Sequence, residues 1–397
     1  MNTRLTGLIL FALTLAAVAA YPSLDTRLIH DPGDDVPPIA TENRPRIDVV
    51  FVLDTTGSMG GLIQTAKDKI WSIARTMASA QPTPDIRIGL IAYRDRGDAY
   101  VTQVVDLSSD LDSVYARLMD FEANGGGDTP ESVNEALADA VHKVSWSQDP
   151  EAYQVIFLVG DAPPHMDYQG ESRYPQILAE ARERGIVVNT IQCGDMPITT
   201  EPWQQIASLG AGRFFQVEQA GGAVVYSTPF DADIASLSAR LDSTRLYYGN
   251  REEIGRMAGK MAATDKLHRE ASVESLARRG AFNASPAGTA NRLGEKDLVE
   301  AVRSGKLNLS DLDDEVLPES LKPLPPAEQE AVVARLGDER DALTRQIRDL
   351  AEKRDDYLAK KIAEEGGAGE SLDQKIFDTV STQAAKAGLT YEGGPDY

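Results

Sequence analysis

"VVFVLDTTGSMG", residues 49–60, joins a run of five apolar residues to an aspartate and a cluster of hydroxyl side chains. The apolar run has the length and composition of a buried strand. Asp54, Thr56 and Ser58 follow at alternate positions, in the spacing D-x-T-x-S. In a tight loop between a strand and a helix, residues two apart can point the same way, and Gly57 gives the loop room to turn. The stretch therefore predicts one carboxylate and two hydroxyls that converge near the start of a helix.

Such a group of oxygen atoms has two interpretations. Hard oxygen ligands suit Mg²⁺, Mn²⁺ or Ca²⁺ better than zinc or copper, so the stretch could hold a divalent cation. Alternatively, Ser58 only caps the helix and Asp54 only ends the strand. The stretch by itself leaves both open.

Two further stretches repeat the pattern of oxygen ligands at element ends. "NGGGDTPESVNEAL", residues 124–137, is a glycine-rich loop that brings Asp128 and Thr129 to an expected helix start. "VIFLVGDAPPH", residues 155–165, is a second apolar strand that ends on an acid, Asp161. Helix capping would have to explain three such loops, so a shared cation site becomes the better interpretation.

The fold class follows from the order of the elements. From Arg46, short apolar runs alternate with amphipathic segments of helical spacing. Several runs are apolar on both faces, which is typical of a mostly parallel sheet covered by helices on each side. We therefore expect residues 45–248 to form one doubly wound α/β domain. In such sheets ligands bind at the carboxyl ends of the strands, where Tyr93, Arg94 and Asp95 are also expected.

These three loops resemble the metal-ion-dependent adhesion site (MIDAS) of the von Willebrand factor type A (VWA) domain, and the chain resembles a bacterial, exported member of that family. The family pattern is D-x-S/T-x-S, a threonine in a glycine-rich loop, and an aspartate after a later strand. Here these are residues 54–58, Thr129 and Asp161. The resemblance covers residues 45–248 in element order and implies a Rossmann-like sheet domain.

The resemblance also implies how each residue would act. The hydroxyls of Thr56 and Ser58 would bind Mg²⁺ (or Mn²⁺ or Ca²⁺) directly, and Thr129 directly or through water. Asp54 and Asp161 would act partly through water molecules. The ion would then keep a position that an Asp or Glu carboxylate of a partner protein can fill. The implied function is non-catalytic, metal-dependent protein binding, and the implied moving element is the helix around residues 231–248.

Two assignments around the site carry alternatives. The second loop departs from the integrin type, so Asp128 could replace or support Thr129 as the ligand. His165, four residues after Asp161, is expected at the rim of the site with Gly57. The alternative for His165 is an exposed loop histidine without a role.

Other functional classes fit less well. A haloacid-dehalogenase-type phosphotransferase needs D-x-D-x-T, but position 56 is a threonine, so its proton-transfer group is missing. The motifs G-x-S-x-G, G-x-x-x-x-G-K and H-E-x-x-H are absent from the sequence. We therefore expect no enzyme. A structural or assembly protein driven by its C-terminal helix remains the alternative.

The net charge and the N-terminal sequence limit the possible partners and the cellular location. Acidic residues outnumber basic ones 62 to 40, for a net charge of −22, which disfavours non-specific nucleic acid binding. Residues 1–20 combine Arg4, an apolar run and small residues, and predict a signal peptide for a periplasmic, secreted or cell-envelope protein. The membrane is a partner only if this segment stays uncleaved as an anchor. Residues 21–45 are expected to be a linker, and the lone Cys193 a core residue.

The rest of the chain is expected to be helical. Residues 249–326 are predicted to be a polar, partly helical linker region, and residues 366–397 a C-terminal helix and tail. Residues 327–365 form a charged helix with apolar residues at intervals of seven. This pattern predicts either a coiled coil through which the chain self-associates or a single helix lying on the α/β domain.

Overall fold

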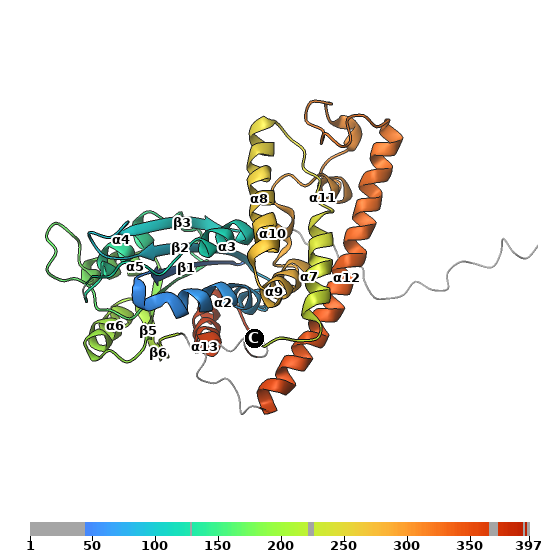
Figure 1. Ribbon diagram of the computed structural model, residues 1–397. Coiled ribbons are helices and arrows are strands. Elements are labelled where there is room, and N and C mark those ends of the chain that lie inside the picture. Colours follow the sequence, from blue (N-terminus) through green and yellow to red (C-terminus); the bar gives the residue numbers. More distant parts are fainter. Residues whose placement is uncertain (1–43, 128, 221–225, 365–371, 392–393, 395–397) are drawn as a thin grey trace, which may run out of the picture. The chain divides into compact units, whose positions relative to one another are not determined.

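The computed structural model describes residues 44–127, 129–220, 226–364, 372–391 and 394 (Figure 1). The predicted signal peptide, nearly all of the predicted 21–45 linker and the candidate ligand Asp128 lie outside these residues. None of the helices in the described parts of the chain combines the length and the apolar composition needed to cross a bilayer.

A six-stranded sheet organises the first half of the chain, with the strand order β3-β2-β1-β4-β5-β6. All neighbouring strands are parallel except β3, which runs antiparallel to β2. The prediction of a mostly parallel sheet flanked by helices is confirmed. The strands are β1 (Arg46–Asp54), β2 (Asp85–Tyr93), β3 (Thr102–Ser108), β4 (Tyr153–Gly160), β5 (Val187–Cys193) and β6 (Ala211–Val217).

The strand order reverses between β1 and β4, the two central strands. Both are buried along almost their whole length, as their continuous apolar sequences require. From this pair the chain extends to one edge through β2 and β3 and to the other through β5 and β6. Asp54 ends β1 and Asp161 follows β4, so both carboxylates lie at the switch point where open α/β sheets bind ligands.

Helices cover both faces of the sheet. On one face the core is shared with α2, α3 and α13, and on the other with α4, α5 and α6. These helices are α2 (Gly60–Ala78), α3 (Leu111–Met119), α4 (Val133–His142), α5 (Tyr174–Glu183), α6 (Pro197–Leu209) and α13 (Leu372–Ala384). Cys193 and Trp203 are completely buried, which confirms Cys193 as a core residue.

The C-terminal helix α13 belongs to the sheet core, far from β6 in sequence. It packs against α2 and β6 (Figure 1), and its Val380 is completely buried. Asp373 at its start forms an ion pair of 2.7 Å with the buried Lys69 of α2. Near its end, the Gln383 side chain accepts a hydrogen bond of 2.7 Å from the Tyr153 hydroxyl. The segment predicted as a helix and tail therefore completes one face of the sheet.

The helix expected to close the α/β series is shorter than predicted. It is α7 (Asp231–Asp242), which ends before residue 248 and makes its main contacts with α9 (Val273–Ala284) and α12 (Pro326–Glu364). The moving element that the family resemblance implies is therefore packed here against two helices that follow it in the chain.

Residues 249–326 are folded, which corrects the expectation of a linker. They hold α8 (Arg251–Glu270), α9, α10 (Thr289–Leu293), α11 (Leu298–Arg303) and a short 3-10 turn at Leu309–Asp311. Helix α8 packs on α3, and α9 packs on both α2 and α7. The polar composition misled the prediction because several of the charged side chains are buried in ion pairs rather than exposed.

The long helix α12 lies on helices of its own chain. It contacts α7, α9 and α11, and buries Leu343 and Ile347 against them. Its buried arginines Arg340 and Arg354 pair with Asp297 and Asp231. Intramolecular packing therefore uses much of the apolar face, and self-association of residues 327–365 stays a prediction.

Candidate functional site

The D-x-T-x-S loop is ordered around Asp54, whose side chain is completely buried at the end of β1. Its Oδ1 accepts hydrogen bonds from the backbone N–H of Thr56 at 2.9 Å and from the Thr56 hydroxyl at 2.6 Å. Its Oδ2 has no hydrogen-bond donor among the described residues. The Ser58 Oγ lies 3.4 Å from the Thr56 Oγ1, and Ser58 is exposed. One orphaned carboxylate oxygen and two adjacent hydroxyls thus gather at one point.

Helix capping does not explain these hydroxyls. Ser58 lies inside a 3-10 turn, Gly57–Met59, and the residue that precedes α2 is Met59. Neither the turn nor α2 has a side-chain hydrogen bond at its N-cap. The capping alternative is therefore wrong for Ser58.

Asp161 places a second carboxylate beside the first. Its charge raises the pKa of Asp54, and a Cβ atom on the preceding Gly160 would lie only 3.0 Å from the Cβ of Asp54. The same Cβ atom would lie 2.5 Å from the Tyr93 hydroxyl. A glycine at position 160 therefore lets β4 approach Asp54 closely, and Tyr93 does line this edge, as expected from the sequence.

Burial is the main cause that raises the pKa of Asp54 to about 7. The hydrogen bonds from Thr56 oppose this rise, and the charge of Asp161 adds to it. The Tyr93 hydroxyl weakly lowers the pKa, although it lies outside hydrogen-bond geometry. Such a carboxylate is costly to ionise without a compensating positive charge, which is what a cation would provide.

The glycine-rich loop lies against the first loop. The Gly57 N–H donates to the Gly125 oxygen at 3.2 Å, and the Asn124 N–H donates to the Thr55 oxygen at 3.0 Å. Gly126 has a φ of +78°, and a Cβ atom there would lie 3.1 Å from the Cβ of Thr56. The structure therefore brings the second loop to the first.

The glycine-rich loop offers two candidate ligands, Thr129 and Asp128. Thr129 is exposed, and it forms no hydrogen bond with the first loop among the residues the structure describes. Asp128 is outside those residues. The choice between Thr129 and Asp128 as ligand stays a prediction.

His165 is buried, in contrast to the exposed loop histidine of the alternative. Its ring stacks on Tyr168 with the centroids 3.9 Å apart. Its Nδ1 lies 2.8 Å from an Asp167 oxygen, and its backbone N–H donates to the Glu131 oxygen at 3.0 Å. His165 thus ties the loop after β4 to the segment after the glycine-rich loop, and a direct role at the rim stays a prediction.

Two residues near the site have roles that the motif did not indicate. Arg94 donates from Nε to the Thr55 oxygen at 3.1 Å and from Nη2 to the Glu122 oxygen at 2.8 Å, so it joins the first loop to the chain leading into the second. Gln219, just after β6, donates from Nε2 to the Asp161 Oδ2 at 2.7 Å. A single amide in a loop gives no sequence signal for this contact.

The candidate site offers oxygen donors of the kind that a divalent cation requires. Across the described ranges, no group of three or more His, Cys, Asp or Glu side chains is placed to hold a metal. The candidate set is of a different kind, with two carboxylates and with hydroxyls for the remaining oxygens. The orphaned Oδ2 of Asp54 and the adjacent hydroxyls of Thr56 and Ser58 fit a hard cation such as Mg²⁺.

We expect the metal-free protein to lose stability as the pH rises, because of Asp54. With a native pKa of about 7 and an ordinary value of 3.8, the native state keeps a proton that the unfolded chain has lost between about pH 4 and pH 7. This group then lowers the free energy of unfolding by up to about 1.4 kcal/mol per pH unit over that range. Asp54→Asn should remove the loss and be more stable than wild type at pH 8. Urea unfolding in chelator at several pH values measures this, and a pH-independent difference between the two proteins would contradict it.

The sheet order and the three loops agree with a match to a known family. Residues 48–228 match the von Willebrand factor A domain family. Residues 48–228 are a VWA domain. The match ends at residue 228, before α7. VWA domains are typically adhesion or protein-binding modules.

The chain matches parts of much longer proteins. Over 209 residues, the chain is 33% identical to von Willebrand factor A domain-containing protein 7 of Mus musculus. This match covers 50% of the chain and 22% of that protein. An ariadne-like RING finger protein of Acanthamoeba polyphaga mimivirus is 28% identical over 124 residues, which cover 31% of the chain and 12% of the relative. The chain thus spans less than a quarter of the length of either relative.

Solved structures resemble the chain more distantly. Proximal thread matrix protein 1 from the mussel byssus, in a form with a zinc-occupied MIDAS motif, has 17% identity and a TM-score of 0.35, and the match covers 44% of this chain and 42% of that one. The SpRpn10 VWA domain has 14% identity and a TM-score of 0.34, and the match covers 46% of this chain and all of the other.

Proposed function

We propose that the VWA domain is a non-catalytic protein-binding module whose binding depends on a divalent cation of the Mg²⁺ type. The observation that carries this proposal is the orphaned Oδ2 of buried Asp54 beside the hydroxyls of Thr56 and Ser58. When bound, the ion would supply a positive centre with a position open to an Asp or Glu carboxylate of a partner protein. The proposal includes export to the periplasm, the cell envelope or the medium, where the partner would be met.

The residues of the site would divide the work. The hydroxyls of Thr56 and Ser58 would hold the ion without neutralising it, which would preserve its attraction for a carboxylate. Asp54, which ends β1, and Asp161, which follows β4, would provide negative charge from buried positions. Arg94 and Gly126 hold the loops in place around them.

Charge sets a condition on the partner. The chain carries a net charge of −22 and therefore repels acidic proteins at long range. At moderate salt this repulsion is screened beyond about 10 Å, so the bound ion must attract the partner's carboxylate at shorter distance. Association should accordingly be faster at moderate salt than at low salt.

Removal of one hydroxyl ligand tests the proposal. Ser58→Ala takes away an exposed oxygen without disturbing the buried Asp54, so the protein should remain folded and its Mg²⁺ binding should weaken strongly. Calorimetric titration with MgCl₂ and MnCl₂, together with thermal unfolding in Mg²⁺ and in chelator, measures the effect. Asp54→Ala should abolish the response.

The matched control is Ser208→Ala, which removes an exposed serine hydroxyl from α6. It should bind Mg²⁺ like wild type. A wild-type chain that shows no saturable response to Mg²⁺ or Mn²⁺ overturns the proposal. Binding that is unchanged in both Ser58→Ala and Asp54→Ala places the ion elsewhere and overturns it as well.

A further inference from the structure

The Gln219 side chain donates a hydrogen bond to one of the two carboxylates of the proposed cation site. Its Nε2 lies 2.7 Å from the Asp161 Oδ2, and also 3.5 Å from the backbone oxygen of Ser58. Gln219 is exposed and follows β6, on a segment that belongs to none of the three ligand loops. A side chain of the protein thus reaches the carboxylate that a cation would use.

The segment that carries Gln219 is held near Asp161 by its packing on α2. The Thr65 hydroxyl donates to the Ala220 oxygen at 2.6 Å. A Cβ atom on Gly61 would lie 3.0 Å from the Cβ of Ala220, so the glycine allows the close approach. On the other side, Gly194 has a φ of +71°, and a Cβ atom there would lie 2.3 Å from the Gln219 Oε1. Both the backbone and the amide of Gln219 are therefore positioned.

The amide group has the wrong polarity for a cation site. A side-chain NH₂ group is a hydrogen-bond donor with partial positive charge, and here it donates to the Asp161 Oδ2. An ion that approaches Asp161 meets this positive group first. The same contact stabilises the metal-free protein, because it gives an oxygen of the buried Asp161 side chain a hydrogen-bond donor.

We propose that Gln219 acts as a latch on Asp161, which holds the metal-free site closed and must swing away when the cation binds. The proposal rests on the proposed function, and it goes further by assigning a residue outside the family's ligand pattern to control the affinity. Gln219 is a positioning residue for Asp161 and sets how much cation is needed to open the site.

Gln219→Ala tests the latch in two measurements that a merely structural role would not move together. Mg²⁺ affinity by calorimetry should rise about three- to tenfold, since the ion no longer has to displace a charge-assisted hydrogen bond. In chelator the variant should unfold at a lower temperature than wild type, and saturating Mg²⁺ should make this difference smaller. The control is Gln216→Ala on β6, whose amide donates to the Gly194 oxygen instead, at 2.8 Å. It should leave the affinity unchanged.

The outcomes separate the latch from the site itself. Unchanged or weaker Mg²⁺ binding in Gln219→Ala, with wild type binding normally, overturns the latch and leaves the proposed function standing. Weaker binding would mean that Gln219 turns its Oε1 to the ion and acts as a ligand. No binding by wild type overturns both proposals. An equal gain in Gln216→Ala would assign the effect to loosening of β6 and also overturn the latch.

Discussion

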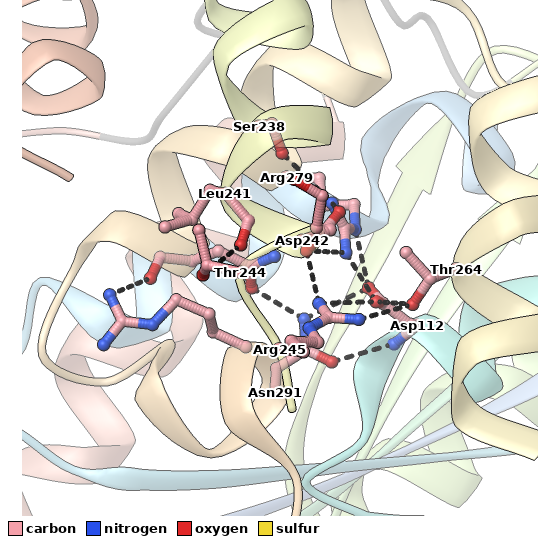
Figure 2. Close-up of polar contacts among 12 residues, drawn as sticks. Asp112, Ser238, Leu241, Asp242, Thr244, Arg245, Thr264, Arg279 and Asn291 are labelled. Atoms are coloured by element: carbon pink, nitrogen blue, oxygen red, sulfur yellow. Dashed lines mark hydrogen bonds and ion pairs between the residues drawn. The ribbon is translucent and has the colours of Figure 1, made fainter. Parts of the chain in front are cut away.

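Replacement of Asp112 by alanine should lower the free energy of unfolding by about 3–5 kcal/mol, because it leaves a buried arginine without its main partner. Asp112 of α3 is completely buried, and Figure 2 shows the polar contacts that its side chain makes. It accepts hydrogen bonds from the Arg279 Nε at 2.7 Å and Nη2 at 2.6 Å, from the Thr264 hydroxyl at 2.7 Å and from the Asn291 Nδ2 at 3.1 Å. These donors come from α8, α9 and α10, so one carboxylate joins the VWA domain to the helical region.

Arg279 would be left with one remaining carboxylate, that of Asp242 at 2.7 Å. Its guanidinium is completely buried, and the loss of one of two partners leaves part of its charge uncompensated. The Asp112 carboxylate is ionised throughout the neutral range, because Arg279 and Lys260 hold its pKa well below the ordinary value despite the burial. The network therefore contributes fully above about pH 4, and its contribution falls as acid protonates these carboxylates.

The same two helices offer a matched control. Asp120, which follows the last residue of α3, pairs with Lys266 of α8 at the surface, where the aspartate side chain is 55% exposed. Asp120→Ala should cost at most about 1 kcal/mol, as solvated ion pairs do. Chemical unfolding of both variants measures the difference. Similar costs for Asp112→Ala and Asp120→Ala would contradict the buried network.

Replacement of Val380 by aspartate should destabilise the protein by more than about 4 kcal/mol, because it places an unpaired charge in the sheet core. Val380 lies on α13 and is completely buried with residues of α2 and the sheet. If α13 were a detached tail, the same change would be almost neutral. The variant therefore tests whether the C-terminal helix completes the VWA domain.

Two further variants of α13 serve as controls for this test. Thr382→Asp puts the same charge on the exposed side of α13 and should cost less than about 0.5 kcal/mol. Val380→Ala should cost about 2 kcal/mol and remain folded, so it gives a measurable value if the aspartate variant does not fold. Near-ultraviolet circular dichroism and urea unfolding follow all three. A Val380→Ala protein as stable as wild type would show that α13 does not pack where we place it.

Local sequence patterns predicted the sheet and the two carboxylates of the candidate site. Continuous apolar runs indicate buried strands, and an acidic residue at the end of such a run has few structural explanations. Asp54 and Asp161 could therefore be found from the sequence, and the parallel order of β1 and β4 places them on neighbouring strands. The position of Tyr93 beside Asp54 followed from the same rule about strand ends.

The helical region was read less well because its charges pair over long distances. Arg279 and Asp112 are far apart in sequence, and a buried arginine on a helix has the same local pattern as an exposed one. Residues 249–326 therefore resembled a polar linker. The same holds for Arg340 and Arg354 on α12, whose partners Asp297 and Asp231 lie outside that helix.

The sequence by itself determined the VWA fold, the two carboxylates at its switch point and the two hydroxyls beside the first of them. These features depend on residues within a few positions of one another and on the rule that parallel strands end at one edge. Only the tertiary structure decided that α13 closes the sheet, that buried ion pairs fix the helical region, and that Gln219 reaches Asp161. Each of those contacts joins segments about 60 to 300 residues apart, and at such separations the partner of a polar or apolar side chain is set by packing rather than by local pattern.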